Sequence, residues 1–234
     1  MLRRMIHRAA FLLPLLAAAP ALAAERSYSV TDFDRLRIEG PYQVTLVTGT
    51  TTRARAKGDQ AALDRVTIEV QSGVLKIHPN RSAWGGTPGA GSGPVTIELA
   101  TRELRAAAIV GAGRLAIDRL RGLKADLSLS GSGAMTIGAV DSDALALTLA
   151  GAGTLKLAGK AKQLRATVQG SGTLDGEGLA ADDATLVSDS SGSIGFRAVR
   201  TARVSANGLG EVRIAGPASC TITGPGAASV ICGK

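Results

Sequence analysis

The side chains best suited to acid–base chemistry in this 234-residue chain are a few carboxylates in its second half. Asp175, Glu177 and Asp189 follow one another closely, with Asp182 and Asp183 between them. Two carboxylates held in opposition can hydrolyse a glycosidic bond, one of them acting as general acid. Asp175 and Asp189 are expected at outward positions on neighbouring units of the repeat described below, so they could form such a cluster. No long segment there would wall a cleft, so solvated surface is the favoured interpretation and a polysaccharide-active enzyme is the alternative.

Other catalytic and cofactor-binding patterns are missing from the sequence. The two histidines are His7 and His78, and His7 falls in the N-terminal segment, so a histidine triad or multi-histidine metal site has one candidate. The Gly-x-Gly tripeptides are followed neither by the Lys-Ser/Thr of a phosphate loop nor by the helix and acid of a dinucleotide fingerprint. We therefore expect no catalytic residue, no metal and no cofactor from these patterns.

Two cysteines and one tryptophan are the remaining candidates for a chemical role. Cys220 and Cys232 are the two cysteines of the chain and fall at inward positions of the last repeat unit. In an exported protein such a pair predicts a disulfide, and closing its short loop is worth about 2–3 kcal/mol. Trp84 lies in the Gly/Pro/Ser-rich segment 80–94, which we expect to form a long loop. This tryptophan would either stack on a sugar or partner, or fold back over the first units as a lid.

The N-terminal segment 1–24 has the pattern of a signal peptide. Arg3, Arg4 and Arg8 precede an apolar run, which ends in the small residues Pro20–Ala24. The run is too short for a comfortable membrane span, which needs about 20 apolar residues. Removing these three arginines from the 27 basic residues leaves 24 against 19 acidic residues, a net charge of +5. The sequence therefore predicts a periplasmic or secreted protein with no membrane span after cleavage.

A glycine tripeptide recurs along the second half of the chain. Its first residues are 20, 20, 19, 20, 18 and 16 positions apart. The copies are Gly111-Ala112-Gly113, Gly131-Ser132-Gly133, Gly151-Ala152-Gly153, Gly170-Ser171-Gly172, Ser190-Ser191-Gly192, Gly208-Leu209-Gly210 and Gly224-Pro225-Gly226. Glycine permits positive φ and close backbone approach, so these tripeptides are typical of corners where stacked turns crowd.

Apolar and polar residues alternate on both sides of each tripeptide. Leu127 and Leu129 precede one corner, and Met135 and Ile137 follow it, with polar residues between them. Period two means that one face of each strand is buried. The sequence therefore predicts an all-β, single-domain parallel β-solenoid over 25–234, right-handed by the crossover preference of parallel strands. Its coils of about 20 residues occupy 95–234, and less regular strands over 25–79 cap the first coil; up-and-down hairpins are the competing arrangement.

Charges in the return segments alternate in sign from one coil to the next. The successive groups are Arg119, Arg121 and Lys124; Asp141 and Asp143; Lys160 and Lys162; Asp182 and Asp183; then Arg197, Arg200 and Arg203. We interpret this order as a device that fixes the register, since a slip by one coil would place like charges together. Alternation also leaves no continuous basic track for phosphates, so no nucleic-acid partner is expected.

An ordered set of motifs resembles one bacterial family. The set is Phe33-Asp34-Arg35-Leu36-Arg37-Ile38-Glu39-Gly40-Pro41-Tyr42-Gln43-Val44, then Gly58-Asp59, then Ser72-Gly73-Val74-Leu75-Lys76-Ile77, then the serial glycine corners. This order is similar to the proteins called "putative autotransporter adhesin, head GIN domain", over nearly all of the chain after Val30. The resemblance implies an exported β-solenoid and supplies no catalytic residues.

These observations favour a protein that binds rather than one that catalyses. We expect an exported, non-catalytic, adhesin-like scaffold or recognition protein of the cell envelope, which binds a partner protein or a glycan through its solenoid faces. The alternative is a carbohydrate-active β-helix enzyme that uses Asp175, Glu177 and Asp189. Fold alone does not decide between them, because function resides in sites rather than in architectures.

Overall fold

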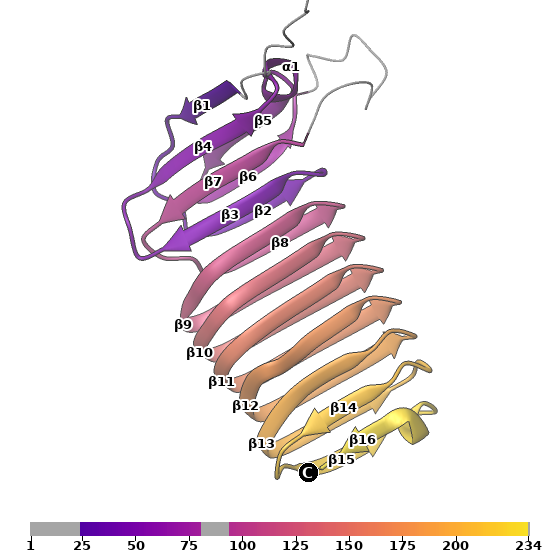
Figure 1. Ribbon diagram of the computed structural model, residues 1–234. Coiled ribbons are helices and arrows are strands. Elements are labelled where there is room, and N and C mark those ends of the chain that lie inside the picture. The colour runs from indigo at the N-terminus through magenta and orange to yellow at the C-terminus, as the bar shows by residue number, and fades with distance from the viewer. Residues whose placement is uncertain (1–23, 81–93, 234) are drawn as a thin grey trace, which may run out of the picture.

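The alternating sequence pattern becomes a stack of parallel β-strands in the computed structural model, which describes residues 24–80 and 94–233 (Figure 1). Strands make up 72% of it, and the solenoid has about six turns whose parallel partners are 20 residues apart. The predicted all-β solenoid is therefore confirmed. The up-and-down hairpins are wrong for the repeated part, because every pairing there is parallel.

Five long strands form the regular coils, and each bends once so that it contributes to two layers (Figure 1). They are β9 (Arg114–Gly131), β10 (Ala134–Gly151), β11 (Thr154–Gly170), β12 (Thr173–Ser190) and β13 (Ile194–Ala206). We call the layer formed by their first halves layer A (114–117, 134–137, 154–157, 173–176, 194–197) and the layer formed by their second halves layer B (125–131, 144–151, 163–170, 183–190, 201–206).

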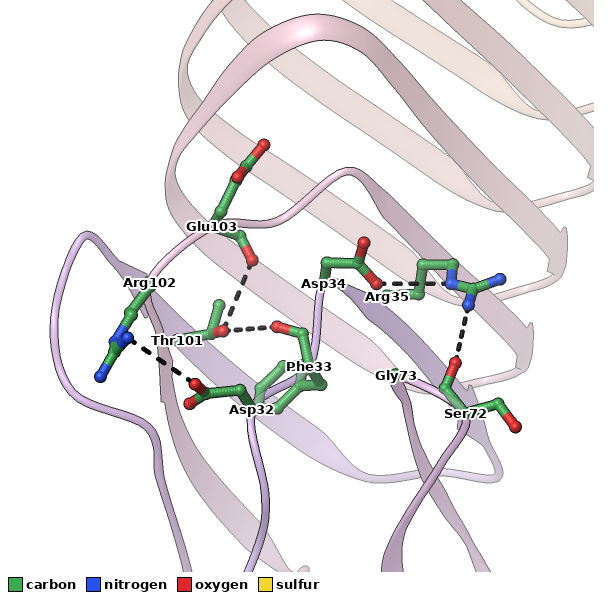
Figure 2. A pocket seen from close by; sticks show the side chains of 9 residues that line it. All are labelled: Asp32, Phe33, Asp34, Arg35, Ser72, Gly73, Thr101, Arg102 and Glu103. Atoms are coloured by element: carbon green, nitrogen blue, oxygen red, sulfur yellow. Dashed lines mark hydrogen bonds and ion pairs between the residues drawn. The ribbon is translucent and has the colours of Figure 1, made fainter.

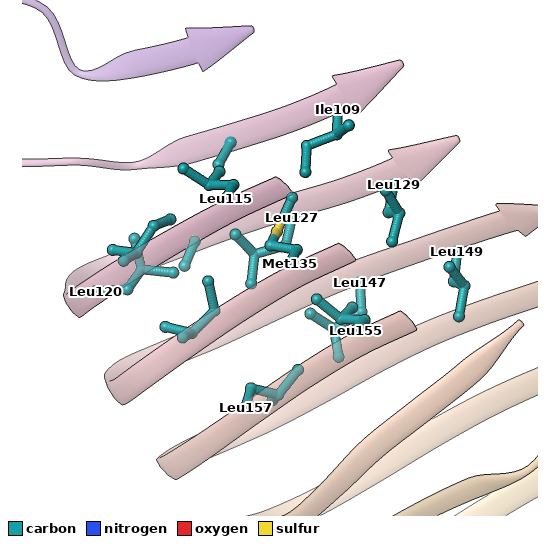
Figure 3. Close-up of a cluster of buried hydrophobic side chains, with 14 of the residues drawn as sticks. Ile109, Leu115, Leu120, Leu127, Leu129, Met135, Leu147, Leu149, Leu155 and Leu157 are labelled. Atoms are coloured by element: carbon teal, nitrogen blue, oxygen red, sulfur yellow. The ribbon is translucent and has the colours of Figure 1, made fainter. Parts of the chain in front are cut away.

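The interior between the two layers is filled by aliphatic side chains (Figure 3). In layer A, Leu115, Met135 and Leu155 stack in register, and in layer B Leu127 and Leu147 do the same. All five are buried. Burying one such side chain contributes about 2 kcal/mol, so each coil gains most of its stability from the column that it shares with its neighbours.

The N-terminal strands do not follow the order of the chain. β2 (Arg35–Glu39) lies between β6 (Val74–Pro79) and β8 (Ala106–Gly111), and all three are parallel. In the other layer, β3 (Gln43–Thr48) lies between β7 (Thr96–Thr101) and β9. The coil that contains β6 and β7 therefore lies nearer the N-terminal end of the stack than the coil that contains β2 and β3, although it comes later in the chain.

Antiparallel strands close the N-terminal end of the stack. β4 (Arg53–Gly58) pairs with β7, β1 (Ala24–Tyr28) pairs with β4, and β5 (Val66–Gln71) pairs with β6. The short helix α1 (Gln60–Leu63) buries Leu63 in the same region. Such a cap covers strand edges that would otherwise pair with another chain.

The C-terminal end is built from short strands. β14 (Val212–Ala215) and β15 (Ser219–Thr223) both pair with β13, and β16 (Val230–Cys232) pairs with β14 after a single 3₁₀ turn, η2 (Ala227–Ser229). A disulfide joins Cys220 of β15 to Cys232 of β16, with their Cα atoms 6.5 Å apart. It links the two layers in the last coil.

Most of the predicted corners have the expected backbone. Among their first residues, Gly111, Gly131, Gly151, Gly170 and Gly224 have positive φ. The Ser190 corner is built differently, because the Ser190 hydroxyl accepts a hydrogen bond of 2.9 Å from the amide of Gly192. The sequence pattern missed one further corner at Gly40, which has φ of 117° and donates its amide to Val110 across the stack.

The alternating charges form ion pairs at two of the four junctions between neighbouring coils that the register hypothesis concerns. Lys162 lies 2.8 Å from Asp143, and Lys160 lies 3.6 Å from Asp141, its partner in the parallel register. Two coils further on, between β12 and β13, Arg200 lies 2.6 Å from Asp183. All these groups are partly exposed, so each pair contributes less than about 1 kcal/mol.

Reversing two of these charges is expected to destabilise the protein in a salt-dependent manner. The double variant Asp141→Lys/Asp143→Lys should lose about 1–2 kcal/mol of unfolding free energy at low salt, because attraction becomes repulsion. At 1 M salt, where the screening length is about 3 Å, the loss should fall by half or more. Denaturant unfolding at both salt concentrations measures this. The neutral control Asp141→Asn/Asp143→Asn should lose less, and an equal loss for the reversed variant at both concentrations contradicts the hypothesis.

Candidate functional site

The structure separates one of the candidate carboxylates, Asp189, from the other two. Asp175 lies in layer A and Asp189 in layer B of the same strand, β12, so they face outward from opposite sides of the solenoid. The expectation that they occupy neighbouring coils and form a cluster is wrong. The strand bends between them, and this bend places the two outer surfaces on opposite sides of the core.

Each of these carboxylates already has a local partner. Lys156 Nζ lies 2.8 Å from Asp175, and its hydrogen bond holds the pKa of that carboxyl below its usual value. Asp189 accepts a hydrogen bond of 2.7 Å from the side-chain amide of Asn207. A general acid needs a raised pKa at neutral pH, so the lowered pKa of Asp175 is the opposite of what acid catalysis requires.

A small hollow of about 330 Å³ surrounds Asp175 on layer A. Glu177 also lines it, together with Glu211 and Arg213 from two coils further on, which the sequence did not single out. Arg213 lies 2.6 Å from Glu211, so these two opposite charges neutralise each other at one side of the hollow. Of the two ion pairs here, Lys156–Asp175 joins neighbouring coils, whereas Arg213–Glu211 lies within one segment.

A larger hollow of about 650 Å³ runs across the outer side of layer B. It crosses five strands, β2, β8, β9, β10 and β11, and neighbouring strands are about 4.8 Å apart, so its length is about 19 Å. We call it the layer B groove, and its lining residues are Asp34, Arg35, Arg105, Ala106, Lys124, Ala125, Asp126, Ala144, Leu145, Ala146, Gln163 and Arg165.

The groove combines an apolar floor with charged sides. Ala144 and Ala146 form part of its floor, because their side chains project less from the sheet than the charged side chains around them. Four cations and two carboxylates line the groove, so its net charge is positive. A shallow, elongated surface of this kind suits an extended ligand better than a compact one.

This groove was not predicted from the sequence, although its signal is present in the repeat. Ala106, Asp126, Ala146 and Arg165 pair in register on successive strands, so they form one outward column. Their spacings of 20, 20 and 19 residues follow the period of the glycine corners. The inward columns are uniformly apolar and could therefore be recognised from the sequence, whereas this outward column mixes residue types.

A third hollow, of about 420 Å³, adjoins the groove, because Asp34 and Arg35 line both (Figure 2). Polar groups that line this hollow form hydrogen bonds with one another. Arg35 donates to the carbonyl of Ser72 at 2.7 Å, and the buried Thr101 hydroxyl donates to the carbonyl of Phe33 at 2.6 Å. These bonds fix the segments that lead into β2 and out of β7, so this hollow supports one end of the groove.

The remaining sequence candidates have mixed outcomes. Trp84 and the signal segment lie outside the described residues. The disulfide is present, and the thiols are therefore not free for catalysis or metal binding. Within residues 24–80 and 94–233, no group of three His, Cys, Asp or Glu side chains is placed to hold a metal ion. In the same part of the chain, no helix is both long and apolar enough to cross a membrane.

The geometry of the coils places this protein in the class of parallel β-solenoids with glycine corners. The profile of the family described as "Putative auto-transporter adhesin, head GIN domain" matches residues 32–218. The chain belongs to this family, as the resemblance in the sequence indicated. A search of curated proteins finds no match.

Solved structures share the fold at low sequence identity. A protein described as a putative adhesin from Bacteroides fragilis has a TM-score of 0.79 and 19% identity over 86% of this chain and 94% of its own. A protein described as a putative lipid binding protein from Parabacteroides distasonis has a TM-score of 0.70 and 20% identity over 90% and 96%. A putative adhesin from Parabacteroides merdae has a TM-score of 0.65 and 16% identity over 88% and 93%. At such identities the likeness shows the fold.

Proposed function

We propose that this protein is an exported, non-catalytic recognition protein of the cell envelope that binds an extended glycan along the layer B groove. The observation that carries the proposal is the groove itself, an open surface about 19 Å long with an apolar floor and polar sides. Small apolar side chains can contact the hydrocarbon faces of sugar rings, while charged and amide side chains at the sides can hydrogen-bond to hydroxyl groups.

Three further observations support this proposal. The signal-peptide pattern of residues 1–24 favours export, and membership of an adhesin-type family favours a surface or envelope location. Asp175 and Asp189 lie on opposite faces, which disfavours the enzyme alternative. The coils stack through a rigid, continuous core, so the groove is preformed and little ordering cost accompanies binding.

Blocking the floor of the groove tests the proposal. Ala146→Trp should weaken binding of the responsive glycan at least tenfold, because the indole would occupy the space above β10. The measurement is equilibrium binding of the oxidised mature protein to a panel of purified linear polysaccharides, neutral and acidic, with product analysis on each ligand.

The matched control is Ala134→Trp, which places the same side chain on the outside of layer A of the same strand. It should bind as the unmodified protein does. Equal binding by both variants contradicts a role for the groove. Release of shortened products that stops on Asp175→Asn establishes the enzyme alternative instead.

A further inference from the structure

We propose that the layer B groove selects acidic linear glycans that carry a negative group on every second sugar. This inference rests on the proposed function, and it specifies the class of glycan from the charges that the groove leaves without partners. Two cations, Lys124 and Arg165, define the selectivity.

The other two cations of the groove are already engaged. Arg35 lies 3.4 Å from Asp34, and Arg105 lies 3.1 Å from Glu103. By contrast, neither Lys124 nor Arg165 has an ion pair within 4.0 Å in the part of the chain that the structure describes, and both side chains are exposed. They are therefore available to an anionic ligand, and neither would have to break an internal contact to bind it.

The separation of these two cations follows from the repeat. Lys124 belongs to β9 and Arg165 to β11, with β10 between them, so they are two coils apart, about 10 Å along the stack. They lie in adjacent outward columns, because Lys124 aligns with Ala144 and Arg165 aligns with Ala146. One coil advances the groove by about the length that one pyranose ring adds to a linear chain. A glycan lying along the groove would therefore meet a cation at alternate sugars, with one sugar over Ala144 and Ala146 between them.

Asp126 and Gln163 favour a sugar over other anions. Asp126 is exposed and has no cation within 4.0 Å among the described residues, although it lies in the register column that leads to Arg165. A carboxylate in a cationic groove needs hydrogen-bond donors from the ligand, and sugar hydroxyls supply them. The Gln163 amide both donates and accepts. An acyl chain has no such donors, and an extended acidic peptide advances about 6.8 Å per two residues, which does not match the 4.8 Å coil spacing.

The experiment compares one glycan in two charge states. The probes are a hyaluronan octasaccharide, which carries a carboxylate on every second sugar, and its carboxyl-reduced, uncharged form. The unmodified protein should bind the acidic form at least tenfold more tightly at low salt. Lys124→Gln/Arg165→Gln should remove that preference, and raising the salt concentration should reduce it in the unmodified protein.

A charge-matched control is Lys156→Gln/Arg213→Gln, which removes two cations from layer A and should keep the preference. Equal binding of both glycan forms, lost on Ala146→Trp but unaffected by Lys124→Gln/Arg165→Gln, overturns this inference and leaves the proposed function intact. No glycan binding, together with binding to anionic lipid vesicles or to an acidic peptide that depends on Lys124 and Arg165, overturns both.

Discussion

Replacing Gly151 by alanine is expected to lower the free energy of unfolding by about 3 kcal/mol. Gly151 has φ of 113°, a conformation that side-chain-bearing residues rarely adopt. A Cβ atom there would lie 2.6 Å from the carbonyl oxygen of Gly131 in the preceding coil. That oxygen accepts the amide of Ala152 at 3.0 Å, so moving it away would break a bond that joins the two corners.

Gly49 allows the two causes of this loss, backbone strain and crowding against the neighbouring corner, to be measured separately. Gly49 also has positive φ, at 80°, but a Cβ atom there would meet nothing within 4 Å. Gly49→Ala should therefore cost only the backbone strain, about 1 kcal/mol. Denaturant unfolding of both variants measures the difference, and equal losses would show that crowding between stacked corners contributes nothing.

The repeat explains why the coils could be predicted from the sequence. A parallel stack requires each position to keep the same environment in every coil, so Leu127 and Leu147 recur with a constant spacing. The bend within each strand has weaker sequence requirements. Its location between Asp175 and Asp189 decides which face each carboxylate occupies, and the alternation of apolar residues alone does not give it.

The order of the N-terminal coils could not be read from the sequence for a different reason. β2 pairs with β6 on one side and β8 on the other, and both partners carry apolar residues at their inward positions. Periodicity predicts that these segments are strands, but it does not say which edges meet. The choice depends on the path of the connections between the strands.

The groove is formed partly by the reordered N-terminal coils and partly by the regular coils. Its charged ends at Arg35 and Arg105 come from the reordered N-terminal coils, whereas Lys124 and Arg165 come from the regular ones. Sequence spacing could have identified the second pair, because both residues lie in outward positions of the regular coils, with one coil between them. Joining them to Arg35 requires the knowledge that β2 lies next to β8.

Reducing the disulfide is expected to loosen the last coil while the rest of the solenoid stays folded. No charged side chain occurs from Ala215 to Gly233, so no side-chain ion pair can hold this end, and its strands are short. The bond between Cys220 and Cys232 closes a short loop, which is worth about 2–3 kcal/mol by loop entropy. Because coils contact only their neighbours, its loss should be local.

Hydrogen exchange distinguishes local from global loosening. After reduction, the amides of β15 and β16 should exchange about 30- to 150-fold faster, which corresponds to the 2–3 kcal/mol of loop entropy, whereas those of β10 and β11 should be unchanged. Cys220→Ser/Cys232→Ser should exchange like the reduced protein and should not respond to reductant. If reduction accelerated exchange equally in β10 and β15, the solenoid would unfold as one cooperative unit, and the disulfide would stabilise the groove as well as the end of the stack.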